Sequence, residues 1–238
     1  MDKIFTKNIE HESAVKHVTG KAIYTDDISE PKNLLHAVIG YSNCSKGVIK
    51  KIDYKDVLSS EGVVDIITEK DIEGINDVGP IFKGDKIFTS KNIEYYGQPI
   101  FAVIAKTNNL AKKAALKVKI DLKISKPIVS IEEALKKKSF VLKPKHLTRG
   151  NIKDGFKKSD NILKGKLYSG GQDHFYLEGQ IAMTIPQEDN NFLVYSSTQH
   201  PAETQQIIGK VLNQNFNSIH VVVRRIGGGF GGKETQSF

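Results

Sequence analysis

The sequence predicts an α+β protein with two successive regions of mixed secondary structure. Three observations support this fold class. Short apolar runs of strand length alternate with polar segments that carry helix-capping residues. Hydrophobic residues make up 39% of the 238 residues and charged residues 26%, which is typical of a folded globular chain. A Lys-rich stretch at 136–160 has few periodic apolar positions and separates the two regions.

Strands and short helices are expected in the first region. Apolar runs predict strands at 35–41, 48–54, 62–67, 99–105 and 118–124. Capping residues predict helix starts after Thr68, Thr107 and Ser130. The strand at 99–105, a helix at 108–117 and the strand at 118–124 would form a β-α-β unit, whose crossover should be right-handed.

Basic charge is concentrated in one part of the chain. Residues 106–166 carry 17 Lys and one Arg against five acidic residues, whereas the whole chain has a net charge of +8. A nucleic-acid surface is disfavoured, because only three of the 35 basic residues are Arg and the chain has no Trp on which bases could stack. We interpret it as a solvated face and a linker.

Composition also limits the compartment and the cofactors of this chain. No stretch approaches the roughly 18 apolar residues of a membrane span, and the first residues show no secretory signal pattern. The single cysteine, Cys44, excludes an internal disulfide and an iron–sulfur cluster or structural zinc site ligated by cysteines of this chain alone. We therefore expect a cytoplasmic protein with no membrane partner.

The second region is predicted to contain strands and one longer helix. Strand-like segments lie at 162–168, 175–184, 192–197 and 218–225. Pro201 suits the first turn of a helix that would continue to about residue 213.

A glycine-rich segment at 226–234 follows the last predicted strand, with five glycines around Phe230. Glycine lets the backbone approach a ligand closely, and successive N–H groups can bind an anion. Two nucleotide-binding patterns nearly fit. The G-x-G-x-x-G pattern lacks the acidic residue expected about 20 positions later. The P-loop pattern fits up to Lys233, but Glu234 stands where a Ser or Thr would bind magnesium.

Two polar segments precede the glycine-rich one. In 170–178, Gln172 can donate a hydrogen bond to an oxo group without bringing negative charge. His174 has no second ligand at close spacing, so a structural histidine is favoured over a metal ligand. Glu178 either pairs with a Lys or faces solvent. In 196–205 small hydroxyls precede a helix start, which suits an anion site and ordinary capping equally well.

Together and in this order, the segments 170–180, 196–205 and 222–237 resemble the molybdenum-binding subunit of xanthine dehydrogenase, in the molybdenum hydroxylase (xanthine oxidase) family. Three earlier segments resemble the α/β-hammerhead domain of the same family, namely 17–28, 80–82 and 95–100. The resemblance implies an α/β-hammerhead domain followed by the truncated start of a molybdopterin-binding domain.

The resemblance also implies domain boundaries. The hammerhead domain would occupy 1–130, with a core at about 17–127. A Lys-rich connector would follow at 131–160, and 161–238 would be an incomplete N-terminal part of the molybdopterin-binding domain. The family's catalytic base lies further C-terminal. We therefore expect a fragment or split product that is inactive until it is joined to the missing C-terminal molybdopterin portion.

The resemblance assigns roles to four residues around a molybdenum–molybdopterin cofactor. Family members hydroxylate an electron-poor ring carbon with oxygen from water. Gln172 matches the residue that hydrogen-bonds the apical oxo ligand, and Phe230 and Gly231 match a loop beside the metal that offers a backbone N–H. None of these residues ligates molybdenum directly. Glu234 matches the glutamate that hydrogen-bonds the purine and stabilises its developing charge.

Substrate and electron partners follow from the same resemblance. Aldehyde oxidases carry an apolar residue at the position of Glu234, and a buried Glu234 would be left unpaired by an aldehyde, so hypoxanthine or xanthine is the expected substrate. Electrons would pass to Fe-S clusters and FAD on partner subunits, and then to NAD. Three alternatives stay open: an aldehyde oxidase-type fragment, a nucleotide-binding module and a non-catalytic interaction module.

Overall fold

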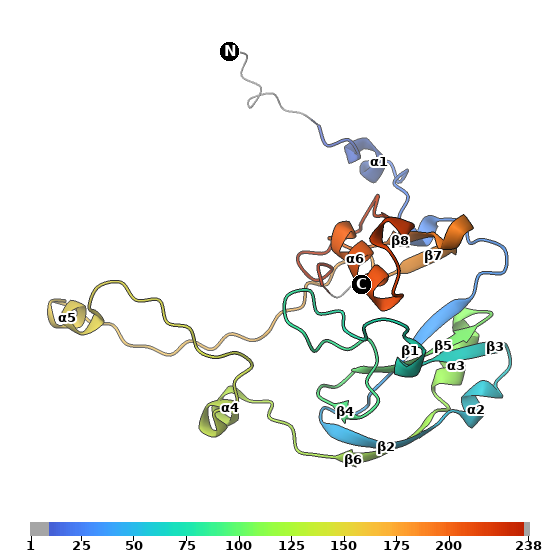
Figure 1. Cartoon of the computed structure of the whole chain (residues 1–238). Helices are drawn as coiled ribbons and strands as arrows, with labels where there is room; N and C mark the ends of the chain where they lie inside the picture. Colours follow the sequence, from blue (N-terminus) through green and yellow to red (C-terminus); the bar gives the residue numbers. More distant parts are fainter. Residues whose placement is uncertain (1–9, 236–238) are drawn as a thin grey trace. The chain divides into compact units, whose positions relative to one another are not determined.

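The computed structural model describes residues 10–235, which form two compact units. The first unit joins the chain up to Ser125 to the chain from His174 onward, and the second unit is Lys126–Asp173. Figure 1 labels their helices and strands. The mixture of helices and largely antiparallel sheets confirms the predicted α+β class.

The main core of the first unit surrounds a three-stranded antiparallel sheet in the order β1-β5-β3. Its strands are β1 (His36–Tyr41), β5 (Pro99–Ala105) and β3 (Val63–Ile67). The central strand, β5, is an apolar run and is almost wholly buried, as such a run should be. Phe101 on β5 is fully buried and meets Tyr54 edge to face, with ring centroids 5.2 Å apart.

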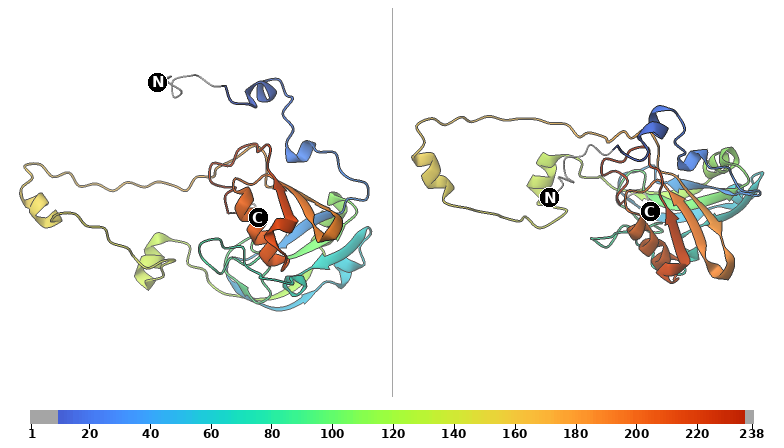
Figure 2. Two further views of the ribbon diagram at one scale, coloured as in Figure 1. Left: turned by 45° about the horizontal axis from the view of Figure 1, so that its top comes forward. Right: turned by 90° about the horizontal axis from the view of Figure 1, so that it is seen from above.

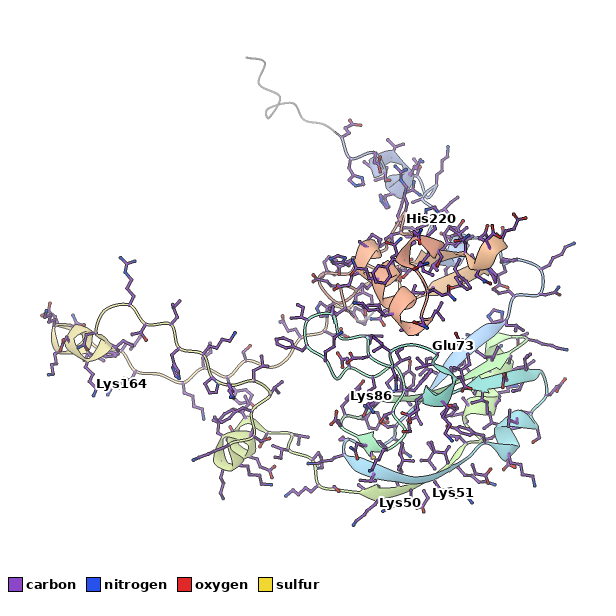
Figure 3. All side chains as sticks on the ribbon, in the orientation of Figure 1. Lys50, Lys51, Glu73, Lys86, Lys164 and His220 are labelled. Atoms are coloured by element: carbon purple, nitrogen blue, oxygen red, sulfur yellow. The ribbon has the colours of Figure 1, made fainter. Side chains whose placement is uncertain are left out.

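A second antiparallel sheet has the order β4-β2-β6. It consists of β4 (Asn92–Ile93), β2 (Gly47–Asp53) and β6 (Lys119–Ile124). The pairing of β2 with β6 shifts register at Lys50, as in a β-bulge. Lys50 and the following Lys51 are therefore both exposed, and Figure 3 labels their side chains.

The predicted β-α-β unit has the right elements but the wrong topology. β5 and β6 do flank the helix α3 (Asn108–Ala115), yet they belong to different sheets, and β6 pairs antiparallel with β2. The alternating side chains of β6 suit the edge of a half-exposed sheet, whereas the apolar β5 needs a buried central place. The predicted cap is confirmed, because the Thr107 hydroxyl accepts the N–H of Leu110 at 3.2 Å.

A third sheet, in the order β7-β8-β9, leads to the glycine-rich segment. It consists of β7 (Ala182–Pro186), β8 (Phe192–Ser196) and β9 (Ile219–Val222). β7 and β8 are antiparallel, whereas β8 and β9 are parallel and are connected through the helix α6 (Pro201–Val211). Figure 2 shows α6 lying beside this sheet. The helix starts at Pro201, as predicted.

Three strand predictions in this region are wrong or too long. Residues 162–168 form no strand, because no described segment pairs with them. The strand expected at 175–184 starts only at 182, since the residues before it contact the glycine-rich segment instead. The strand expected at 218–225 covers only 219–222.

Short helices complete the described chain. In the first unit these are α1 (Ala14–Val18), α2 (Lys55–Leu58), η2 (Thr25–Asp27), η3 (Glu69–Asp71), η4 (Glu188–Asn190) and η5 (Phe216–Ser218). The predicted cap at Thr68 is confirmed, because its hydroxyl accepts the N–H of Lys70 at the start of η3. No described helix is long and apolar enough to cross a membrane.

The second unit holds two short helices in an extended chain. They are α4 (Ile131–Lys137), which Ser130 caps as predicted, and α5 (Ile152–Lys157), which the sequence interpretation missed. Asn151 caps α5 by accepting the N–H groups of Lys153 and Asp154, and such an Asn is the signal that could have revealed the helix. Neither helix has a buried residue.

Candidate functional site

Parts of the two polar segments identified in the sequence meet around the glycine-rich one. This loop, residues 226–234, is called the glycine loop below. It turns back on itself, because the N–H of Gly232 donates to the carbonyl of Gly229 at 2.7 Å. Residues 176–180 and 197–199 each form hydrogen bonds with it. The last two residues of the segment 222–237 lie outside the described chain.

A buried ion pair anchors the glycine loop to the first polar segment. The Lys233 side chain is 0% exposed, and its Nζ lies 3.1 Å from Oε2 of Glu178, which is 11% exposed. The same oxygen accepts the N–H of Gly227 at 2.6 Å. The Lys233 ammonium also lies 4.8 Å from the centre of the Tyr176 ring. Of the two alternatives for Glu178, pairing with a lysine is the one observed.

Gln199 anchors the loop to the second polar segment. Its Oε1 accepts the N–H of Gly231 at 2.9 Å and that of Lys233 at 3.2 Å. Its own backbone N–H donates to the carbonyl of Lys233 at 2.8 Å. Gly229 is buried against this side chain, and a Cβ atom there would overlap the Gln199 carboxamide. A glycine at this position is therefore required by close approach.

The hydroxyls at the start of the second polar segment are buried and form hydrogen bonds inside the protein. Ser197 and Thr198 are fully buried, and the Thr198 hydroxyl donates to the carbonyl of Lys233 at 3.4 Å. The N-terminus of α6 is capped by Nδ1 of His200, which accepts the N–H of Glu203 at 3.3 Å. Ordinary capping, rather than an anion site, is thus the arrangement that the structure shows.

Phe230 and Gly231 form the exposed tip of the glycine loop. Phe230 is 75% exposed, and Gly231 has a φ of +90° with open space where a Cβ would lie. The Gly231 N–H points to Gln199. By contrast, the successive N–H groups of Gly228, Gly229 and Phe230 donate to no atom in the described part of the chain. Such a row of donors can hold an anion or a polarised ligand.

The other two site candidates, Gln172 and Glu234, are both exposed. Gln172 belongs to the second unit, and Glu234 lies at the end of the glycine loop in the first unit. Glu234 follows Lys233 directly and is exposed, and its backbone N–H donates to the carbonyl of Gly231 at 3.4 Å. Within this chain Lys233, and not Glu234, occupies the buried position, and the purine-binding role of Glu234 stays a prediction.

The same ion pair argues against a P-loop. A P-loop lysine must reach the β- and γ-phosphates of the nucleotide. Here the ammonium of Lys233 is wholly buried and is held by Glu178. A P-loop also opens a helix, whereas the described residues after Phe230 form turns. The nucleotide-binding alternative therefore loses its main cationic group.

The roles of Lys233 and Gln199 were not anticipated from the sequence. Lysine is rarely buried unless it is paired, and its partner here lies 55 positions away. Gln199 has no local pattern that marks it as a hydrogen-bond anchor. The only available signal was the resemblance itself, which placed both residues inside matching segments.

Comparison with known protein families assigns both parts of the chain. Residues 19–126 match the family model of the aldehyde oxidase and xanthine dehydrogenase a/b hammerhead domain. Residues 133–238 match the model of the molybdopterin cofactor-binding domain. The chain belongs to the xanthine dehydrogenase and aldehyde oxidase family of molybdenum hydroxylases. The predicted order of a hammerhead domain before the start of a molybdopterin-binding domain is confirmed.

Curated relatives of both kinds are similar over nearly the whole chain. The xanthine dehydrogenase of Dictyostelium discoideum is 39% identical over 98% of this chain, and aldehyde oxidase 2 of Mus musculus is 40% identical over 94%. This chain covers only 17% of either relative. It therefore spans about one sixth of their length.

A solved structure shares the fold of this molybdenum hydroxylase chain. Aldehyde oxidoreductase from Desulfovibrio gigas superposes with a TM-score of 0.81 and 26% identity, over 94% of this chain and 27% of that one.

Within residues 10–235, no group of three or more His, Cys, Asp or Glu residues is placed to hold a metal ion.

Proposed function

We propose that this chain is the N-terminal part of the molybdenum-cofactor subunit of a xanthine dehydrogenase-like enzyme. The observation that carries the proposal is the glycine loop. Its exposed tip, Phe230 and Gly231, is attached to two other family segments through Glu178 and Gln199. The tip is therefore held in a fixed place, as a residue pair beside a cofactor must be.

The donors at the tip fit a molybdopterin cofactor. Three successive backbone N–H groups, those of residues 228–230, have no acceptor in the described chain, and Gly231 leaves open space beside them. Such donors suit the polar and anionic groups of the cofactor. When bound, the molybdenum cofactor supplies the oxidation of an electron-poor carbon with oxygen from water. Gln172 would add a neutral hydrogen-bond donor to the oxo group of the cofactor. The chain would ligate the metal through none of its own side chains.

Glu234 would bind a purine, hypoxanthine or xanthine. Its side chain is exposed, and its carboxylate could accept an N–H from the heterocycle. The aldehyde oxidase alternative has support too, because the relatives of the two kinds are similar to this chain at 39–40% identity. Glu234 favours the purine, since it would add a hydrogen bond to the ring that a simple aldehyde cannot make.

The remaining parts of the enzyme would come from outside these residues. The catalytic base would lie in the C-terminal molybdopterin portion, so that the present chain alone would be inactive. The two electrons taken from the substrate would leave through Fe-S clusters and FAD on a partner subunit to NAD. The single cysteine, Cys44, is buried and is consistent with redox centres on other chains.

Coexpression tests this proposal. The chain would be produced together with the C-terminal molybdopterin portion and the Fe-S/FAD subunit of a relative, and the purified complex would be assayed for molybdenum and for xanthine-dependent NAD reduction. We expect close to one molybdenum per chain and turnover that depends on both partners. A stable complex that contains no molybdenum would contradict the proposal.

A further inference from the structure

The ion pair beneath the glycine loop joins two points that flank its tip. Lys233 follows the tip residues Phe230 and Gly231, and Gly227 precedes them. Both are bound by one carboxylate oxygen, Oε2 of Glu178. One side chain from another segment therefore holds both ends of the loop.

A backbone hydrogen bond adds to this connection between Glu178 and the loop. The N–H of Glu178 donates to the carbonyl of Gly227 at 3.3 Å, so that the two residues exchange backbone and side-chain hydrogen bonds. A Cβ on Gly227 would lie 2.5 Å from Cβ of Glu178, which shows how closely the two chains approach. These contacts fix the position of Glu178 against Gly227.

Because the ion pair is buried, the conformation of the glycine loop depends on it. Lys233 is fully buried, and its ammonium donates to Glu178 and lies over the Tyr176 ring. The second carboxylate oxygen of Glu178, Oε1, is buried and has no hydrogen-bond partner in the described chain. Removing either charge would leave the other buried without compensation, and the loop would have to open to hydrate it.

We propose that Glu178 and Lys233 are positioning residues for the molybdenum site, in which their ion pair holds the glycine loop closed. Neither side chain reaches the exposed face of the loop, so each acts through the residues that it holds. Closure places Phe230 and Gly231 for the cofactor, and it turns Glu234 outward because the neighbouring Lys233 points inward. The inference rests on the proposed function for the identity of the ligand, but the closure is a property of this chain.

Amide hydrogen exchange tests the closure without any cofactor. In the 238-residue chain, exchange would be followed by NMR at Gly231 and Lys233, whose N–H groups donate to Gln199. We expect Glu178→Gln and Lys233→Met each to accelerate exchange at both amides at least tenfold, with the amides of β5 unchanged as a check of folding. Glu178→Asp, which keeps the charge on a shorter side chain, should give an intermediate effect.

Two exposed residues supply matched controls. Lys210→Met and Glu61→Gln make the same chemical changes at exposed sites, and exchange at Gly231 should stay at its original rate. Loop exchange that is unchanged in both Glu178→Gln and Lys233→Met would overturn the inference. If one variant fails to fold, the β5 amides reveal it and Glu178→Asp decides.

Measurements on the assembled enzyme distinguish a positioning role of the ion pair from a purely structural one. In the molybdenum-loaded complex, we expect Glu178→Gln to lower kcat per molybdenum about tenfold and to alter the molybdenum(V) electron paramagnetic resonance signal, with KM nearly unchanged. Loss of molybdenum with unchanged kcat per remaining metal would mean a structural role only and would overturn the assignment. A wild-type complex without molybdenum would instead contradict the proposed function, and the exchange measurement would still decide the closure.

Discussion

Gln199 occupies the space that a side chain at Gly229 would need, with its carboxamide packed against the glycine backbone. Gly229→Ala should therefore displace Gln199 and break its bonds to Gly231 and Lys233. We expect a loss of about 1–3 kcal/mol in the free energy of unfolding, measured by urea denaturation. Gly165→Ala is the control, because nothing lies within 4 Å of a Cβ there, and it should change the free energy by less than about 0.5 kcal/mol. Equal effects of the two substitutions would contradict this packing.

The hammerhead core makes a similar prediction at Gly40. A Cβ on this residue of β1 would overlap the ring of Phe101, which is fully buried. We expect Gly40→Ala to destabilise the chain by about 1–3 kcal/mol. The double variant Gly40→Ala/Phe101→Leu should lose less free energy of unfolding than the two single variants lose together, because the smaller side chain relieves the overlap. Strict additivity in chemical denaturation would argue that the two residues do not touch.

Tyr54 should make the stability of the first unit fall at alkaline pH. Burial raises the pKa of its phenol to about 12, and the negative charge of Asp71 adds to the effect. In the unfolded chain the phenol ionises near pH 10, so the unfolded state loses its proton first. The stability that neutral Tyr54 contributes is complete below about pH 10 and declines as the pH rises toward 12.

Tyr54→Phe removes this titration. The difference in free energy of unfolding between wild type and variant should therefore change between pH 9 and pH 11.5, by an amount on the order of 1 kcal/mol for a partly buried ring. Urea denaturation at both pH values measures it. Parallel pH profiles for the two proteins would show that the phenol is not shielded.

Limited proteolysis tests the division into two units. The second unit, Lys126–Asp173, contains no buried residue and many lysines, so trypsin should cleave there first. The flanking pieces belong to one compact unit and should stay associated after cleavage. Native mass spectrometry would detect them as one complex. Their separation would contradict the described first unit.

Local signals in the sequence predicted local structure well. Thr107 and Ser130 mark helix starts because their hydroxyls reach backbone donors three residues away. β5 was recognisable because its run of apolar residues has strand length and ends in a polar cap. In each case the deciding interaction involves neighbours in the chain, so a short window of sequence contains it.

Pairing over long distances was not predictable in this way. Nothing within 118–124 says that β6 pairs with β2 about 70 residues earlier rather than lying beside β5. The run 162–168 resembles a strand, but a strand needs a partner, and none is present in the described chain. The alternating pattern defines which side chains can share a face and leaves the partner open.

The candidate site was predicted in part. The resemblance identified the three segments, and the structure brings residues 176–180, 197–199 and 226–234 together. The Glu178–Lys233 pair could not be deduced, because either residue alone suits an exposed surface. The sequence also does not say which of two adjacent charged residues, Lys233 or Glu234, points inward.

In the proposed function, Glu234 is the residue on which purine hydroxylation would depend most directly. The decisive measurement compares kcat/KM for xanthine and for an aromatic aldehyde in the assembled enzyme, with Glu234→Ala and wild type at matched molybdenum content. We predict that the alanine variant loses at least 100-fold for xanthine, equivalent to about 2.7 kcal/mol of transition-state stabilisation, and changes little for the aldehyde. An unchanged xanthine rate in a molybdenum-loaded Glu234→Ala enzyme would contradict the assignment.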